Sequence, residues 1–314
     1  MEYKKLGSTD LNISQIGFGC WAIGGHGYGR VDDRESVKAV RKALDLGINF
    51  FDTADVYGLG HSEEILSKAL GSKKHDVIIA TKFGVNWDSN GKTFLDCSPK
   101  RIETALDASL GRLKLETIPL YQIHWYDNVT PLYEILSVLK RCQEIGKIRH
   151  IGLSNFPTSL LMEFVDVCNI ESIQIPFNII NNEIDEDIIR YSEKQNVSII
   201  VYNVLLRGLL TGKYHPDSIF NEGDTRAGDS NFSAKSMCEY RSIIDELSKI
   251  GKLCNKKPSQ VAIRWVLNNR YVTCAIVGAK TTIQVEENAD VFEWNIPNDE
   301  NIWRHGTQMC RCKT

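Results

Sequence analysis

Two short apolar runs and the segment between them decide the fold: residues 49–53 read Asn-Phe-Phe-Asp-Thr, residues 77–82 read Val-Ile-Ile-Ala-Thr-Lys, and Ser62–Leu70 lies between them. Short apolar runs rich in β-branched and aromatic residues are typical of buried strands, and the segment between them is long enough for a helix. Parallel neighbours in a sheet need such a crossover connection. Residues 49–82 therefore predict a β-α-β unit and a parallel sheet.

The same alternation continues along the chain. Eight runs predict strands: Ile16–Trp21, Asn49–Thr53, Val77–Lys82, Leu120–His124, Arg149–Ser154, Ser172–Pro176, Ser198–Tyr202 and Cys274–Gly278. Helical patterns follow nearly all of them, at Glu35–Gly47, Ser62–Leu70, Pro99–Leu113, Pro131–Gly146, Thr158–Val167, Asp185–Gln195 and Thr281–Ala289. Eight such units predict an α/β fold, a closed (β/α)₈ TIM barrel, with residues 1–314 as a single domain. A doubly wound open sheet is the alternative.

Two segments interrupt this rhythm. Tyr3–Leu6 and Leu11–Ser14 flank a turn-rich stretch, which predicts an N-terminal β-hairpin that plugs one end of the barrel. Residues 203–273 are far longer than a usual loop and contain the polar stretch Asp217–Ser236. They also predict extra helices near the C-terminal part, one with Ile243, Ile244, Leu247 and Ile250 and one after Pro258. A loop of this length predicts a functional segment on the active-site face.

Composition excludes several classes of protein. The chain has 37 Lys+Arg against 40 Asp+Glu, and a net charge of −3 argues against a nucleic-acid or anionic-membrane partner. The N-terminus shows no apolar signal segment and no run is long enough to span a membrane, so we expect a cytoplasmic protein. The nine scattered cysteines predict reduced, mostly interior thiols, and Cys310 with Cys312 gives too few ligands for a metal site.

One glycine pattern matches a known motif but lacks the structural context that the motif requires. Gly17, Gly19 and Ala22 satisfy the G-x-G-x-x-G/A dinucleotide fingerprint. That fingerprint needs a helix that opens at once beneath the pyrophosphate, and no helical pattern begins before about Asp33. We therefore expect these glycines to let the first loop pass close to a ligand or a neighbouring loop.

Four polar residues stand at the ends of consecutive predicted strands. Asp52, Lys82 and His124 end strands two, three and four, and Tyr57 follows in the loop after strand two. In a barrel these positions converge on one rim. Asp52 is the natural partner of Lys82, and a cation beside Tyr57 is expected to lower the phenol pKa and make it a proton donor near neutral pH. A structural ion pair with a half-buried His and Tyr is the alternative that these residues alone leave open.

Seven segments resemble those of the aldo-keto reductase family, and they occur in the same order and with similar spacing. The resemblance covers about residues 1–295. They are Phe51–Gly58 (Phe-Asp-Thr-Ala-Asp-Val-Tyr-Gly), Ala80–Gly84, Tyr121–Trp125, Gly146–Asn155, Gln174–Asn178, Arg207–Lys213 and Gln284–Asn288. The resemblance implies the barrel fold and the reduction of aldehydes or ketones with a nicotinamide cofactor, NADPH with NADH as the alternative.

The resemblance also assigns residues to roles. Tyr57 would give a proton to the carbonyl oxygen, Lys82 held by Asp52 would assist it, and His124 would orient the carbonyl. It implies a cofactor site of Trp21, Asp52, Ser154, Asn155, Gln174, Tyr202, Asn203, Leu205, Arg207, Gly208, Lys213, Gly278, Lys280, Gln284, Glu287 and Asn288. Within this set Lys280 would meet a 2′-phosphate, although a solvated surface lysine is the alternative. Trp21, Trp87 and Trp125 follow strands one, three and four, and these positions predict a substrate pocket, for a small carbonyl compound, of Trp21, Tyr57, Trp87, His124 and Trp125. The alternative is that some of these tryptophans cover the cofactor or the barrel rim.

The chain departs from the family pattern after strand seven, where Tyr202-Asn203-Val204-Leu205 replaces the usual small residue and proline, and the tail Arg304–Thr314 matches no family segment. Two rival functions stay open at this point: an NADPH-binding regulatory or channel-associated subunit, and a metal-dependent hydrolase that uses His124 and Asp52. Whether the protein is a monomer or a homo-oligomer stays open as well.

Overall fold

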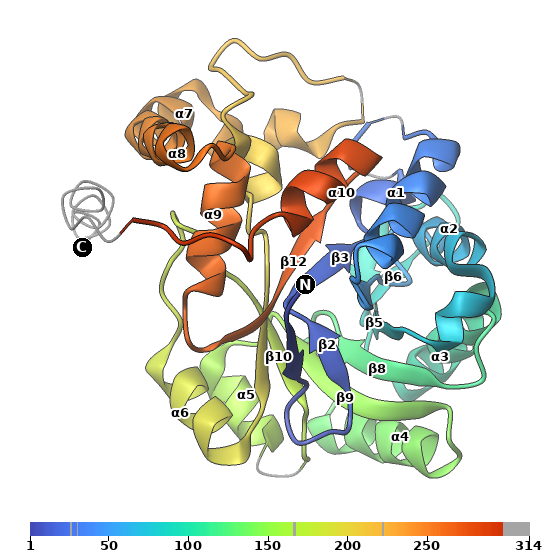
Figure 1. Ribbon diagram of the computed structural model, residues 1–314. Helices are drawn as coiled ribbons and strands as arrows, with labels where there is room; N and C mark the ends of the chain where they lie inside the picture. The colour runs from blue at the N-terminus through green and yellow to red at the C-terminus, as the bar shows by residue number, and fades with distance from the viewer. Residues whose placement is uncertain (26, 30, 166–167, 222, 298–314) are drawn as a thin grey trace.

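The protein folds into a closed barrel of eight parallel strands, in the order β10-β11-β12-β3-β4-β5-β8-β9 (Figure 1). We describe a computed structural model of residues 1–297, without residues 26, 30, 166, 167 and 222. The barrel strands are β3 (Ile16–Gly19), β4 (Phe50–Asp52), β5 (Ile78–Phe83), β8 (Ile118–Ile123), β9 (Ile148–Ser154), β10 (Ser172–Pro176), β11 (Ser198–Tyr202) and β12 (Val272–Gly278). This confirms the predicted TIM barrel and excludes the open sheet.

Helices surround the barrel. They are α1 (Asp33–Asp45), α2 (His61–Leu70), α3 (Pro99–Leu113), α4 (Leu132–Glu144), α5 (Thr158–Val165), α6 (Glu186–Gln195) and α10 (Thr282–Ala289). Their ends follow local chemistry: the Asp32 side chain accepts from the Arg34 amide before α1, and Ser98 caps α3, which begins at Pro99. The predicted helix Thr158–Val167 ends in two residues that lie outside the described ones, as do the tail Arg304–Thr314 and both Cys310 and Cys312.

The predicted N-terminal hairpin forms from β1 (Tyr3–Lys5) and β2 (Asn12–Ser14), and it lies in front of the barrel in Figure 1. Leu6 and Ile13 are fully buried with Phe50 and Leu120 in the cluster that fills this end of the barrel. The hairpin turn is also held by a hydrogen bond of 2.7 Å from the Gly7 amide to Ser198 Oγ. The hairpin therefore closes the barrel at the N-terminal ends of the strands and leaves the other end for a site.

The dinucleotide-fingerprint interpretation is excluded, as expected. Among the described residues between β3 and Asp33, where α1 begins, the helical structure is a short 3₁₀ turn, η1 (Ala22–Gly24). Gly24, a later glycine of the same loop, lets the first loop pass close to the loop that carries Tyr57, because a Cβ on Gly24 would lie 3.0 Å from the carbonyl carbon of Tyr57. A second small hairpin, β6 (Val85–Trp87) paired with β7 (Thr93–Leu95), follows β5 and was not predicted.

The long connection between β11 and β12 holds the extra helices that the sequence predicts. It contains η3 (Leu206–Thr211), η4 (Thr225–Gly228), η5 (Ser230–Phe232), α7 (Ala234–Glu239), α8 (Arg241–Cys254) and α9 (Pro258–Leu267). Within the polar stretch of residues 217–236, Phe220 and Phe232 pack with each other and with Tyr214, which precedes the stretch, at ring-centroid distances of 5.3 to 5.5 Å. These contacts attach the stretch to the chain that follows η3.

Most of the described cysteines are buried free thiols, as the sequence predicts. Among the described residues, Cys20, Cys97, Cys142, Cys168 and Cys274 are free and buried, whereas Cys238 is exposed and Cys254 is half-buried. In the same part of the chain we find no helix with the length and apolar character needed to cross a membrane.

Candidate active site

The four predicted catalytic residues come together at one end of the barrel. Asp52 is the last residue of β4, Lys82 lies in β5, and His124 directly follows β8. Because β4, β5 and β8 are neighbours in the barrel, the carboxyl ends of these strands lie side by side. Tyr57 lies in the turn after β4, where its amide donates to the Ala54 carbonyl at 3.1 Å.

Lys82 and Asp52 form a buried ion pair. Lys82 is fully buried, and its Nζ donates to Asp52 Oδ1 at 2.6 Å and to the Thr53 carbonyl at 2.8 Å. The second carboxylate oxygen of Asp52 accepts from Gln174 at 2.9 Å and from Gln122 at 3.3 Å. A charge buried at this depth is stable only when its hydrogen-bonding capacity is met in this way.

Tyr57 lies against this ion pair but is not ionised by it. Lys82 Nζ lies 5.1 Å from the centroid of the Tyr57 ring. Burial nevertheless raises the pKa of Tyr57 well above its usual value, and the negative charge of Asp52 adds to the effect. The prediction that this pKa is lowered is therefore wrong. The physical reason is that Asp52 neutralises the lysine, so desolvation of the phenolate dominates.

His124 faces the edge of the Tyr57 ring. The two ring centroids are 5.6 Å apart and the planes are nearly perpendicular, at 81°. Burial, with the nearby charge of Lys82, holds the pKa of His124 well below its usual value. The imidazole is therefore neutral at pH 7, with one N–H donor and one acceptor nitrogen. A neutral ring suits a hydrogen bond to a carbonyl oxygen.

Amide and hydroxyl groups lie beside the four predicted catalytic residues, Asp52, Tyr57, Lys82 and His124, which we call the tetrad. The Tyr202 hydroxyl donates to Asn155 Oδ1 at 2.7 Å, and Asn155 Nδ2 donates to the His124 carbonyl and to Ser154 Oγ, both at 3.0 Å. Asn155 holds a left-handed backbone with φ of 60°, which asparagine tolerates better than most residues. Together with Gln174 this cluster offers both donors and acceptors, as an amide ligand such as the nicotinamide carboxamide requires.

Three cations surround one tyrosine on the other side of Trp21. Arg207, Arg226 and Lys280 lie 5.3, 5.3 and 5.5 Å from the centroid of the Tyr28 ring. Lys280 Nζ donates to the Tyr28 carbonyl at 2.7 Å, and burial with the like charge of Arg226 lowers its pKa. A cation that is half-buried among like charges gains most from an anion. This cluster therefore fits the phosphates of a nicotinamide dinucleotide.

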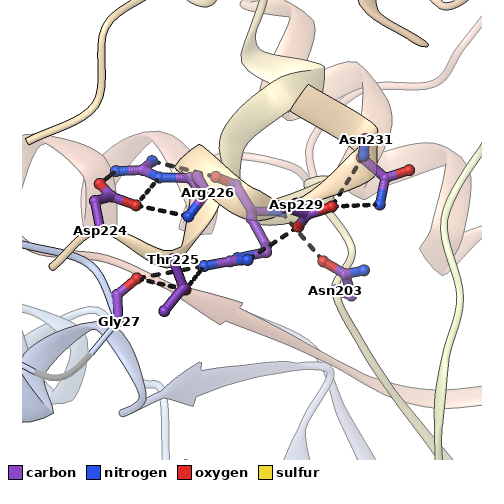
Figure 2. Close-up of polar contacts among 8 residues, drawn as sticks. Gly27, Asn203, Asp224, Thr225, Arg226, Asp229 and Asn231 are labelled. Atoms are coloured by element: carbon purple, nitrogen blue, oxygen red, sulfur yellow. Dashed lines mark hydrogen bonds and ion pairs between the residues drawn. The ribbon is translucent and has the colours of Figure 1, made fainter. Parts of the chain in front are cut away.

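The segment Asp224–Asp229 crosses from the long connection to the first loop of the barrel (Figure 2). Figure 2 shows Thr225 beside Gly27, where the Thr225 Oγ1 donates to the Gly27 carbonyl at 2.9 Å. Arg207 donates to Asp229 at 2.9 Å, and Arg226 forms an ion pair with Asp224. These contacts bridge the two loops that flank the cation cluster.

Tyr28, Arg226, Asp224 and Asp229 were not predicted as site residues. Their signal in the sequence is weak: Arg226 is the single arginine in the stretch Asp217–Ser236. Its partners in the cation cluster come from the first loop and from the segment after β12, far away in the sequence. Only the fold brings them together.

The other predicted cofactor residues divide into two groups. Asn203, Leu205, Gly208 and Lys213 lie on or next to η3, where Asn203 Oδ1 accepts from the Arg207 amide at 3.1 Å. Gly278, Gln284, Glu287 and Asn288 lie at the end of β12 and in α10. Gln284 accepts from the Lys280 amide at 2.8 Å, whereas Glu287 forms an ion pair with Lys257 away from the cation cluster.

The three tryptophans of the predicted substrate pocket lie just before η1, in β6 and directly after His124. Trp21 stacks on Tyr57 with ring centroids 6.1 Å apart, and Arg207 covers Trp21 at 5.2 Å. Trp125 directly follows His124 and is 44% exposed, so its ring is available to a ligand. Trp87 lies in β6, half-buried, with the Arg101 guanidinium 4.9 Å from its ring centroid.

Comparison with known proteins gives the family of the chain. The model of the aldo/keto reductase family matches residues 15–302, and the chain belongs to that family of oxidoreductases. It is 36% identical over 303 residues to the aldo-keto reductase YhdN of Bacillus subtilis, covering 96% of this chain and 91% of that protein. It is 30% identical over 309 residues to the NADH-specific methylglyoxal reductase of Escherichia coli, covering 93% of each.

A solved structure gives the same result for the fold. The glycerol dehydrogenase of Gluconobacter oxydans superimposes with a TM-score of 0.86 at 38% identity, covering 98% of this chain and 94% of that one. The fold and the family that the motifs of the sequence implied are thereby confirmed.

Proposed function

We propose that this protein reduces an aldehyde or ketone to an alcohol, with NADPH as the hydride donor and Tyr57 as the proton donor. The single observation that carries the proposal is the arrangement of Tyr57 between the buried Lys82–Asp52 pair and the neutral His124. Family membership supports the reaction class.

Each residue of the tetrad has a separate task in this proposal. The raised pKa of Tyr57 keeps its hydroxyl protonated at neutral pH, so the proton is present to be given to the carbonyl oxygen. The ammonium of Lys82 lies 5.1 Å from the phenol ring and stabilises the phenolate that remains. Neutral His124 donates a hydrogen bond that orients the carbonyl, and Asp52 holds Lys82 in place.

Bound NADPH supplies the hydride that adds to the carbonyl carbon. Ser154, Asn155 and Gln174 would hold its carboxamide, and Tyr202 would lie against its ring. Lys280, supported by Arg207 and Arg226, would hold the phosphates. Arg207 and Arg226 are already paired with Asp229 and Asp224, so we propose that Lys280 decides the preference for NADPH over NADH. NADH is the alternative cofactor, since one relative is an NADH-specific reductase.

The substrate is proposed to be a small carbonyl compound held by Trp21, Trp87 and Trp125. One relative is a glycerol dehydrogenase and another is a methylglyoxal reductase, so three-carbon compounds belong in the first test. The experiment is the carbonyl-dependent loss of NADPH absorbance over a panel of methylglyoxal, glyceraldehyde and aromatic aldehydes, with glycerol and NADP⁺ for the reverse direction. Turnover of at least one carbonyl supports the proposal, and bound NADPH without turnover on the panel contradicts it.

A further inference from the structure

Arg101 connects three separate elements beside the proposed site. It lies in the first turn of α3, where its amide donates to the capping Ser98 Oγ at 3.4 Å. Its side chain is only 11% exposed. The guanidinium forms an ion pair with Asp55, donates to the Val85 carbonyl at 3.2 Å and lies 4.9 Å from the centroid of the Trp87 ring.

The first of these contacts ties α3 to the loop that carries Tyr57. Asp55 is fully buried, lies two residues before Tyr57, and its amide donates to the Lys82 carbonyl at 3.3 Å. Its Oδ2 atom accepts from Arg101, and its Oδ1 atom is buried with no hydrogen-bond partner among the described residues. Burial raises the pKa of Asp55 to about 7, and Arg101 opposes this rise. Of the nearby cations, Arg101 therefore contributes most to the charged form of this carboxylate.

The other two contacts hold the β6–β7 hairpin. Val85 and Trp87 are the two ends of β6, whereas Phe94 and Leu95 in the partner strand are 48% and 44% exposed. An exposed two-stranded ribbon of this kind has little stability by itself. At the other end of the hairpin, a Cβ on Gly91 would lie 3.4 Å from Leu59 Cδ1, in the loop after Tyr57. The hairpin thus stands beside the Tyr57 loop, and Arg101 fastens it there.

The chemistry of these contacts is specific to arginine. A planar guanidinium can pair with a carboxylate through one edge and lie flat on an indole with its face. Lysine keeps the positive charge but cannot make both contacts at once. The conservative change Arg101→Lys therefore separates geometry from charge.

We propose that Arg101, anchored by Asp55, is a positioning residue that sets the Trp87 ring against the carbonyl substrate and so determines substrate specificity. This inference rests on the proposed function, because it takes Trp87 as a wall of the carbonyl pocket. It predicts that Arg101 acts on substrate affinity through Trp87, with little effect on cofactor binding or on proton transfer from Tyr57.

The chain offers a matched control within the same helix. Arg112, in the last turn of α3, donates to Glu63 at 2.6 Å, with side chains 18% and 0% exposed against 11% and 0% for Arg101 and Asp55. The described contacts of Arg112 include no aromatic ring and no part of the β6–β7 hairpin. Arg112→Lys therefore disturbs a buried ion pair of the same kind without touching Trp87.

The test measures kcat and KM for an aromatic aldehyde and for methylglyoxal, together with the NADPH Kd from quenching of protein fluorescence. For Arg101→Lys we expect KM for the aromatic aldehyde to rise about tenfold, the scale of a lost cation–π contact, with kcat and NADPH Kd changed less than about twofold. For Arg112→Lys we expect KM within about twofold of the unmodified protein. An unchanged KM in Arg101→Lys, or an equal rise in both variants, overturns the inference.

A double-mutant cycle with Trp87→Leu decides whether Arg101 acts through Trp87. If it does, Arg101→Lys raises KM by less than about twofold once Trp87 is gone; fully additive effects contradict the inference. Hydrogen exchange over residues 85–95 gives a readout that needs no turnover, and Arg101→Lys should speed exchange there where Arg112→Lys does not. If the unmodified protein turns over no carbonyl, the proposed function fails, and the specificity role of Arg101 fails with it. If the unmodified protein turns over a carbonyl but Arg101→Lys leaves both hydrogen exchange and KM unchanged, only the inference about Arg101 fails.

Discussion

The ammonium of Lys82 lies 5.1 Å from the centre of the Tyr57 ring, yet its hydrogen bonds go to Asp52 Oδ1 and the Thr53 carbonyl. The lysine is thus close enough to stabilise a phenolate, yet the pKa of Tyr57 is raised and its hydroxyl stays protonated. Tyr57 therefore stays protonated until it transfers its proton to a substrate. The remaining predictions test the parts of the molecule that support this arrangement.

The Lys82–Asp52 pair should be costly to break from one side. Lys82→Met leaves the buried Asp52 carboxylate without its cation, and we expect a loss of about 3–5 kcal/mol in the free energy of unfolding. The double variant Lys82→Met with Asp52→Asn should recover most of that loss because no buried charge remains. Urea unfolding measures both, and a single variant as stable as the unmodified protein would refute the buried-pair description.

Lys280 should distinguish the two cofactors. Lys280→Met is expected to weaken NADPH binding by about 1–3 kcal/mol, the range of a charge-assisted contact, and to leave NADH binding nearly unchanged. Lys249→Met, an exposed lysine on α8, is the control for a general loss of positive charge. Equal losses for NADPH and NADH in the Lys280 variant, measured by fluorescence titration, would show that the 2′-phosphate lies elsewhere.

The neutral His124 should make the fold less stable in acid. The pKa of His124 in the folded protein is below the unfolded value of about 6.5. Just below pH 6.5, His124 is therefore protonated in the unfolded chain but stays neutral in the folded protein. Stability contributed by this group is complete above about pH 6.5 and falls on acidification, by at most about 1.4 kcal/mol per pH unit for one proton. Urea unfolding from pH 7 to pH 5 should show a shallower decline in His124→Gln. Identical slopes in the two proteins would mean that His124 is not held neutral.

The segment of residues 207–236 is predicted to act as a lid over bound cofactor. Arg207 and Thr225 already connect it to the first loop through Gly27, and the phosphates would add contacts to the same cations. We therefore expect NADPH to slow hydrogen exchange over residues 207–236 more than over the barrel strands, and lid opening to limit cofactor release. The same exchange with and without NADPH would eliminate the lid.

The barrel itself could be predicted because its signals are local. Runs such as Ile78–Phe83 and helix starts such as Ser98–Pro99 are determined by residues next to them in the chain. The tetrad followed from the barrel, since strand ends such as Asp52 and His124 meet at one rim.

What the sequence could not predict depends on contacts between distant segments. Asp55 and Arg101 are 46 residues apart, and Arg207 reaches Gly27 across 180 residues, so no spacing pattern reveals either pair. The direction of the Tyr57 pKa was mistaken for a related reason. It depends on how deeply the ring is buried and on how completely Asp52 neutralises Lys82, and both are properties of the folded molecule.

The most direct test of the central claim is the rate of carbonyl reduction by Tyr57→Phe, measured by NADPH absorbance with the NADPH Kd measured alongside. Phenylalanine keeps the ring between Trp21 and His124 but removes the transferable proton. The account predicts a loss of kcat of at least about 10²-fold with NADPH affinity changed little, the scale of general-acid catalysis. A variant that binds NADPH normally and reduces the carbonyl at near the unmodified rate would contradict the account.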